Sequence, residues 1–194
     1  MAHEWTAETA EWYAAHYGEY ATNRLAVDAL DLPPDAVIVD VGCGAGAALR
    51  HASQRVTSGA LIGVDPVPRM VEIAQARAAD HPAQARLDFR VGPAEKLPVD
   101  DNIADFVFAF DSFDHWQDKA AGLAEVGQIL RPTGQLVVVK DGGVPGGSEA
   151  VRTFTSELTK AGFAVVRTES IAVEDVAFAL WVCAATELTG KNQE

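Results

Sequence analysis

A buried strand that runs directly into a glycine-rich turn constrains this chain more than any other feature. Residues Val37–Val41 form an apolar run interrupted by one acid, which is typical of a parallel strand covered on both faces. Glycine then occupies every second position, at Gly42, Gly44 and Gly46, and a helix-compatible segment spans residues 45–54. A turn without Cβ atoms can approach a bound molecule closely and present backbone amides to it. The segment therefore predicts a small-molecule site where a strand meets a helix.

The spacing of the glycines separates two kinds of nucleoside-cofactor site. A dinucleotide-binding turn has the pattern G-x-G-x-x-G, with amides that face a pyrophosphate. Here the third glycine comes one position early, and Ala47 stands where that pattern allows Gly or Ala, so the fit is only partial. The pattern D-x-G-x-G-x-G over residues 40–46 instead resembles the first motif of class I S-adenosylmethionine-dependent methyltransferases. The resemblance implies a cofactor cradle formed by Asp40, Gly42, Cys43, Gly44 and Gly46.

Two acids at strand ends support a nucleoside cofactor. The Asp40 carboxylate would repel a phosphate but attract the ammonium of a methionine moiety. A second strand is predicted over residues 60–65, and its last residue, Asp65, would lie beside the glycine turn and accept hydrogen bonds from both ribose hydroxyls. Methyltransferases and NAD enzymes share an acid at this position, so Asp65 supports nucleoside binding without separating the two families.

The segment after Asp65 resembles the methyltransferase turn that leads to a Met or Leu packed against adenine. Pro66 and Met70 occupy the matching positions. Met70 also recurs with Ile73 and Ala74 at helical spacing, so a core contact of the second helix is an equal alternative for it.

Two later motifs carry the rest of the resemblance. Residues 92–98 are similar to the family turn G-x-A-E-x-L-P, which implies that Ala94 and Glu95 meet the adenine edge. A carboxylate at Glu95 can accept a hydrogen bond from the exocyclic amine, whereas a solvated loop acid is the alternative. Residues 125–136 resemble the family segment E-x-x-R-V-L-R-P-G-G-x-L, with Gln in place of the first Arg and Thr in place of the first Gly.

A buried strand predicted over residues 104–110 leads into a polar segment that is the candidate reaction site. The resemblance places Phe110, Asp111 and Trp116 beside the cofactor. A sulfonium methyl is already electrophilic, so such an enzyme mainly aligns the acceptor and excludes water, and a base is optional. If the acceptor must lose a proton, the candidate bases are Asp111, Asp114 and His115. His115 and Asp111 are the predicted catalytic residues, with a structural or cofactor-facing role as the alternative for His115.

Aromatic residues are concentrated before the first strand. Residues 1–35 are predicted to form a helical lid, because in relatives the segment before the first strand folds over the cofactor. Residues 20–24 resemble the part that approaches the methionine end, which makes Tyr13, Tyr17 and Asn23 candidate contacts. The alternative is that the aromatic side chains only pack the first helices against the sheet edge.

The strand pattern and the resemblance together predict a single α/β domain over residues 1–194. We expect a Rossmann-like three-layer sandwich with a seven-stranded, mostly parallel sheet and an antiparallel last strand. Residues 36–188 would form the core, and residues 189–194 a loose tail. The predicted elements of the second half begin with a helix that ends before Pro132 and has an apolar stripe of Leu123, Val126, Gly127 and Leu130. They continue with a strand over 135–140, a glycine-rich loop over 142–148, a helix over 149–161, and a closing pair over 163–171 and 177–185 joined by an acidic turn at 174–175.

Composition narrows the classes of partner. The chain carries 28 acidic and 15 basic residues, a net charge of −13, which disfavours binding to a phosphate backbone and favours a small-molecule acceptor. No apolar run long enough to cross a membrane and no signal-peptide pattern is found, so we expect a cytoplasmic protein that does not insert into membranes. The two cysteines and five scattered histidines predict neither a disulfide nor a metal site. The aromatic N-terminal segment could form a homodimer surface.

The resemblance implies methyl transfer from S-adenosylmethionine to a small-molecule acceptor, with S-adenosylhomocysteine as the product. Two alternatives remain open. A non-catalytic or regulatory protein could keep the cofactor pocket, since the short loop after the fifth strand leaves little room for an acceptor site. An NAD(P)-dependent oxidoreductase would need a pair of residues for hydride transfer, and the sequence offers no such pair.

Overall fold

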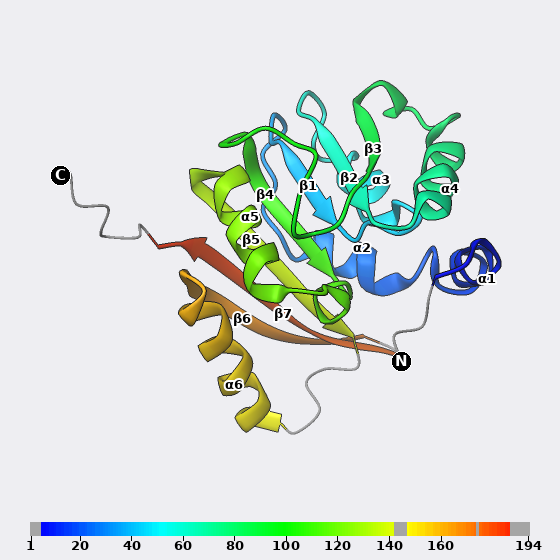
Figure 1. The fold of residues 1–194 in the computed structure, drawn as a ribbon. Coiled ribbons are helices and arrows are strands. Elements are labelled where there is room, and N and C mark those ends of the chain that lie inside the picture. The colour runs from blue at the N-terminus through cyan, green and yellow to red at the C-terminus, as the bar shows by residue number, and fades with distance from the viewer. Residues whose placement is uncertain (1–4, 142–146, 174, 187–194) are drawn as a thin grey trace.

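The computed structural model describes residues 5–141, 147–173 and 175–186, and Figure 1 shows the arrangement of its elements. The helices are α1 (Ala7–Tyr17), α2 (Ala21–Asp28), α3 (Ala47–Ala52), α4 (Pro68–Ala78), α5 (Lys119–Ile129) and α6 (Gly147–Lys160). The strands are β1 (Ile38–Val41), β2 (Leu61–Asp65), β3 (Leu87–Val91), β4 (Ala104–Phe110), β5 (Leu130–Asp141), β6 (Phe163–Val173) and β7 (Val176–Ala185). Two short 3-10 helices are η1 (Gln84–Arg86) and η2 (Phe113–His115).

The strands form one seven-stranded sheet in the order β3-β2-β1-β4-β5-β7-β6. β1 pairs in parallel with β2 and β4, and the pairs β2–β3 and β4–β5 are also parallel. β7 runs antiparallel to both of its neighbours, β5 and β6. The predicted α/β class, the mostly parallel sheet and the antiparallel last strand are therefore confirmed.

Helices cover both faces of the sheet, with α5 and α6 on the face nearer the viewer in Figure 1. Adjacent residues of β1 belong to different cores, because Ile38 packs with α2, α3 and α4 while Val39 packs with α5 and α6. A strand buried on both faces needs apolar side chains in succession, which explains the apolar run in the sequence. α1 rests on α4, where Ala10 and Ala14 pack against Met70.

The start of the fifth strand differs from the sequence prediction. Leu130, which the apolar stripe assigns to the preceding helix, is the first residue of β5 and pairs with Ala104. The register between β4 and β5 then shifts before Phe106, so the turn at residues 132–134 lies inside β5 as a bulge. Gly127 is exposed and takes no part in the buried stripe of α5. A strand interrupted by a turn has no continuous apolar pattern, and its first residue therefore resembles the end of a helix.

Some predicted features lie outside the described residues, namely most of the glycine-rich loop at 142–146, Glu174 of the acidic turn, and the tail from residue 187. Among the described helices, none combines the length and the apolar character needed to cross a bilayer. The described part of the chain also contains no group of three or more His, Cys, Asp or Glu side chains arranged to hold a metal ion.

Candidate functional site

The carboxyl ends of the central strands define the candidate site. The strand order reverses between β1 and β4, and ligands of open α/β sheets bind in the crevice outside such a switch point. The glycine turn follows β1, Asp65 ends β2, Asp111 follows β4 and Asp141 ends β5. The fold therefore brings residues from four segments of the sequence to one edge of the sheet.

The three glycines of the turn differ in how closely other atoms approach them. Gly42, Gly44 and Gly46 adopt φ angles of 77°, 50° and 76°, in the left-handed region that favours glycine. A Cβ atom at Gly42 would lie 2.3 Å from the Cβ of Ser112, and one at Gly46 would lie 2.6 Å from the ring of Phe89. A Cβ atom at Gly44 would meet no atom within 4 Å. Gly42 and Gly46 thus serve the packing of the turn, and Gly44 is the position that faces open space.

Asp65 holds this turn in place. Its Oδ2 accepts a hydrogen bond from the Gly44 amide at 2.9 Å, and its Oδ1 accepts one from the Val67 amide at 2.9 Å. Burial raises the pKa of Asp65, and the two amide hydrogen bonds oppose that rise. Each carboxylate oxygen can accept more than one hydrogen bond, so Asp65 can hold the turn and still bind a hydroxyl.

Asp40 is a buried acid beneath the turn. Its side chain is 2 % exposed, and its Oδ1 has no hydrogen-bond partner within the described residues. Burial, followed by the negative charge of Asp65, raises the pKa of Asp40 to about 8. In the free protein at neutral pH, Asp40 is therefore mostly protonated, whereas a cation placed nearby would favour its ionised form. Cys43 is also buried here, and burial raises the pKa of its thiol.

Asp111 and Asp141 form a pair of acids at the ends of β4 and β5. The Asp141 amide donates to Asp111 Oδ1 at 2.5 Å, and the Asp111 amide donates to the Val139 carbonyl at 3.0 Å. Asp111 has a positive φ of 52°, which is uncommon for a residue other than glycine. Burial raises the pKa of Asp111 to about 6, with the charge of Asp141 adding to the rise and its amide hydrogen bond opposing it. The sequence prediction missed Asp141, although it directly follows the strand predicted over 135–140.

The other candidate bases have different surroundings. Asp114 is exposed and forms ion pairs with Lys140 at 2.9 Å and with Lys119 at 3.3 Å. Burial is the largest single effect and raises the pKa of Asp114, but the hydrogen bonds and charges of Lys140 and Lys119 together outweigh it, so the pKa is lowered. His115 is exposed on η2, and its ring makes no hydrogen bond with the described residues. Among the three candidates, Asp111 alone combines burial with a position at a strand end.

The N-terminal helices reach over this edge of the sheet. Thr22 of α2 is fully buried and donates a hydrogen bond to Asp141 Oδ1 at 3.3 Å. Burial raises the pKa of Tyr13 in α1, and Asp111, followed by Tyr17, Asp141 and Asp65, raises it further through its charge. The charge of Asp141 is also the largest cause of the raised pKa of Tyr20.

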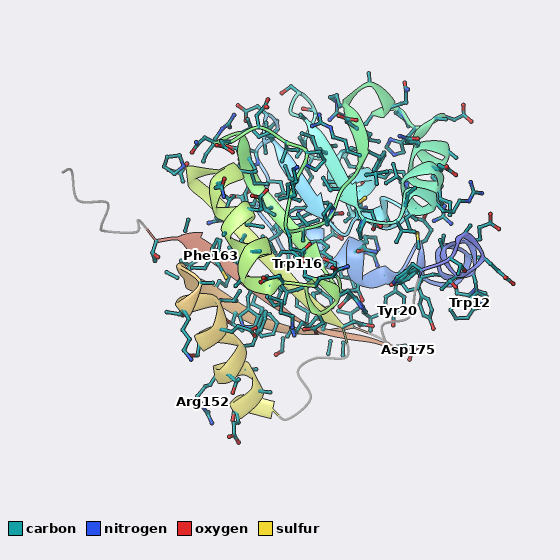
Figure 2. All side chains as sticks on the ribbon, viewed as in Figure 1. Trp12, Tyr20, Trp116, Arg152, Phe163 and Asp175 are labelled. Carbon is teal, nitrogen blue, oxygen red and sulfur yellow. The ribbon has the colours of Figure 1, made fainter. Side chains whose placement is uncertain are left out.

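The aromatic side chains of α1 continue outward from Tyr13. The ring of Tyr17 is 5.1 Å from that of Tyr13 and is 42 % exposed, and Trp12 is exposed on the outer side of α1 (Figure 2). Asn23 lines a hollow of about 300 Å³ between α2 and α3, together with Arg50. Of the predicted lid contacts, Tyr13 and Asn23 are half-buried, whereas Tyr17 is exposed.

The residues predicted for adenine form two groups. On the side of α4, Met70 is buried against Ala10 and Ala45, which favours the core-contact alternative, and Pro66 is exposed. Phe110 is buried and stacks on Phe108 with ring centroids 4.6 Å apart, so it is part of the core beneath the site.

On the side of α5, Trp116 is buried, and its Nε1 has no hydrogen-bond partner among the described residues. A Cβ atom at Gly122 would lie 2.5 Å from the Trp116 ring and 3.4 Å from Ala94, so these three residues are packed together. Glu95 Oε1 accepts a hydrogen bond from the Asp118 amide at 2.8 Å, which ties its loop to the start of α5. Glu95 is therefore not a purely solvated acid.

A further hollow of about 540 Å³ lies at the amino ends of the parallel strands, where Asp105, Arg131 and Gln135 line it. Its lining includes none of the predicted site residues. Two of its charged lining residues are paired with each other, since Arg131 Nη1 donates to Asp105 Oδ1 at 2.5 Å.

Comparison with protein families matches residues 39–138, more than half of the chain, to the methyltransferase domain. An uncharacterized 37.1 kDa protein of transposon TN4556 from Streptomyces fradiae is 36% identical over 113 residues, which are 58% of this chain and 32% of that protein. The ubiquinone/menaquinone biosynthesis C-methyltransferase UbiE of Citrifermentans bemidjiense is 30% identical over 118 residues, or 60% of this chain and 50% of that protein. The chain thus spans a third to a half of the length of these curated relatives.

Solved structures show the same fold at low sequence identity. A SAM-dependent methyltransferase from Aquifex aeolicus superposes with a TM-score of 0.75 at 18% identity, over 94% of this chain and 100% of that one. A geranyl diphosphate methyltransferase in complex with GPP and sinefungin gives a TM-score of 0.69 at 16% identity, over 84% and 76% of the two chains. The resemblance seen in the motifs is confirmed: the chain belongs to the methyltransferase domain family, which has the class I fold and S-adenosylmethionine as its cofactor.

Proposed function

We propose that this chain transfers the methyl group of S-adenosylmethionine to a small-molecule acceptor. The observation that carries the proposal is the open position at Gly44 in a turn held by Asp65, at the switch point of the sheet. An open backbone position at Gly44, whose amide is already bonded to Asp65, and an acid with spare acceptor capacity fit an uncharged sugar diol better than a pyrophosphate. The geometry therefore favours a nucleoside without phosphates.

The surroundings offer a partner for each part of this cofactor. Asp65 would accept hydrogen bonds from the ribose hydroxyls. Asp40 would ionise beside the cationic methionine end, which removes the cost of its unpartnered oxygen. The proposed cofactor contacts are Asp40, Gly42, Cys43, Gly44 and Gly46 in the turn, Asp65, Pro66, Met70, Ala94, Glu95, Phe110 and Trp116 around the nucleoside, and Tyr17, Asn23 and Asp111 near the methionine end.

The chain's own task is alignment, exclusion of water and removal of a proton. The bound cofactor supplies an electrophilic methyl group, whose bond to sulfur breaks with the electron pair left on sulfur. Thr22 holds α2 against Asp141 at this edge of the sheet, and the lid would exclude water from the acceptor once the cofactor is bound. Asp111, with a pKa of about 6, is mostly ionised at neutral pH and would take the proton that the acceptor loses, with His115 as a second candidate.

A small organic acceptor suits the charge of the chain. A net charge of −13 opposes binding to a nucleic-acid backbone. The relatives named UbiE are C-methyltransferases of ubiquinone and menaquinone biosynthesis, and we propose that this chain likewise acts on a small organic molecule.

Titration calorimetry with S-adenosylhomocysteine, S-adenosylmethionine and NAD tests the proposal. We expect the first two to bind and NAD not to bind, because the third glycine comes one position early for a pyrophosphate turn and an anion at Asp40 would repel a pyrophosphate. Incubation with methyl-labelled cofactor and a panel of small phenols, amines and thiols should then reveal transfer. Binding of NAD without binding of S-adenosylhomocysteine would contradict the proposal.

Substitutions at Gly42 and Gly44 should distinguish the packing of the glycine turn from its proposed contact with the cofactor. Gly44→Ala should cost about 1 kcal/mol of folding free energy, because alanine is strained at positive φ, and should weaken cofactor binding through the new methyl group. Gly42→Ala should lower the melting temperature much more, because its methyl group would collide with Ser112. Thermal unfolding and calorimetry on both variants measure this. Equal losses of stability in the two variants would show that Gly44 is also a packing position.

A further inference from the structure

One carboxylate at the junction of the lid helices contacts two helices of the core. Glu19 lies between α1 and α2, and its Oε1 accepts hydrogen bonds from Nη2 of Arg50 and, at 2.8 Å, from Nη1 of Arg77. Arg50 belongs to α3, which follows the glycine turn, and Arg77 belongs to α4. Glu19 therefore joins the lid to the two helices that flank the cofactor side of the sheet.

Arg50 extends this connection to the glycine turn itself. Its Nη1 donates to the carbonyl of Ala45, the residue between Gly44 and Gly46, at 2.5 Å. The Arg50 side chain is only 11 % exposed, and burial lowers its pKa while the charge of Glu19 raises it. A guanidinium with so little access to water depends on these partners for its hydrogen bonds. The position of the turn and the position of Glu19 are thus coupled through one side chain.

Arg77 holds the same junction from the other side. Its Nη2 donates to the Ala14 carbonyl of α1 at 2.8 Å. A Cβ atom at Gly18 would lie 2.4 Å from Arg77 Nη1 and 2.3 Å from the Ala14 oxygen. The backbone at the end of α1 is therefore in close contact with the guanidinium, and this position has no room for a side chain.

We propose that Glu19, Arg50 and Arg77 form an electrostatic clasp that positions the lid on the glycine turn, so that Glu19 is a positioning residue for cofactor binding. The clasp lies three residues before Thr22, whose hydrogen bond to Asp141 attaches the lid to the other side of the site. The lid is thus held at both sides of the strand-end crevice. The effect on the cofactor rests on the proposed function, whereas the docking of the lid does not.

The matched test compares Glu19→Gln with Glu11→Gln. Glu11 accepts a hydrogen bond from Arg69 of α4 at 2.9 Å and is exposed to a similar degree, 58 % against 65 % for Glu19, but it makes no contact with Arg50. Glu19→Gln should bind S-adenosylhomocysteine roughly five-fold more weakly than the unmodified protein. This factor corresponds to the loss of an ion pair that contributes about 1 kcal/mol. Hydrogen exchange of backbone amides in residues 7–28 should be faster in the same variant. Glu11→Gln should bind the cofactor product as the unmodified protein does.

Gly18→Ala provides an independent variant, because it displaces Arg77 without removing a charge. It should change exchange and affinity in the same direction as Glu19→Gln, and raising the salt concentration should narrow the difference between Glu19→Gln and the unmodified protein. The proposal is overturned if exchange in residues 7–28 is unchanged in Glu19→Gln, or if Glu11→Gln weakens binding equally. If the unmodified protein does not bind S-adenosylhomocysteine at all, the proposed function fails. Hydrogen exchange of residues 7–28 in Glu19→Gln then still tests whether the clasp holds the lid in place.

Discussion

Asp65→Ala should weaken binding of S-adenosylhomocysteine by at least about 100-fold, since each hydrogen bond from a ribose hydroxyl to a carboxylate contributes about 1.5–3 kcal/mol. The variant also leaves the amides of Gly44 and Val67 without their acceptor, which loosens the turn that faces the cofactor. Asp65→Asn keeps the size of the side chain but replaces one acceptor with a donor, so its affinity should be intermediate. Titration calorimetry on the three proteins measures the effect.

Asp105→Ala is the matched control for this loss. Asp105 also accepts a hydrogen bond from a backbone amide, that of Val37 at 2.8 Å, but it lies at the opposite end of the sheet. Its removal should lower stability by about 1–3 kcal/mol and leave cofactor affinity unchanged. If Asp105→Ala weakened binding as much as Asp65→Ala, the loss would reflect general loosening of the fold, and Asp65 would not be a ribose contact.

The stability of the free protein should fall by several kcal/mol between pH 4 and pH 8, largely because of Asp40. Its pKa is about 8 in the folded protein and 3.8 in its ordinary state, and each unit corresponds to about 1.4 kcal/mol. The folded state binds the proton of Asp40 more tightly than the unfolded state does. The contribution of this protonation to the free energy of unfolding is therefore complete below pH 4 and is lost as the pH rises towards 8. The raised pKa values of Asp65 and Asp111 act in the same direction.

Asp40→Asn should remove most of this pH dependence. Urea unfolding at several pH values measures it, and the variant should be more stable than the unmodified protein above pH 8. Asp114→Asn is a control with the opposite pH dependence. The pKa of Asp114 is lowered, so the contribution of this carboxylate to the free energy of unfolding is lost as the pH falls. A flat stability profile in the unmodified protein between pH 4 and pH 8 would show that Asp40 has a partner or water that satisfies its charge.

The sheet could be predicted because parallel strands carry their signal locally. Residues 104–110 were predicted as a strand and form β4 with the same bounds, since a strand buried on both faces is apolar throughout. β5 was predicted too short at both ends. Its start contains a bulge at residues 132–134, and its last residue, Asp141, pairs with Phe178 of β7, which is far away in sequence.

The candidate site was predictable where a motif fixes the backbone. The D-x-G-x-G-x-G pattern indicated the turn, and the structure adds that Gly44 alone among its glycines faces open space. The contacts of Thr22 with Asp141 and of Arg50 with Glu19 were not predictable, because each joins segments that are distant in sequence and whose relative positions only the folded chain defines. The buried, unpartnered state of Asp40 likewise depends on packing rather than on local sequence.

A crystal structure of the protein with S-adenosylhomocysteine tests the central claim most directly. We predict the ribose hydroxyls within hydrogen-bond distance of Asp65, the methionine part along Gly44, and the sulfur on the side of Asp111. Density for the nucleoside elsewhere, for example in the hollow of about 540 Å³ lined by Asp105 and Arg131, would contradict the account.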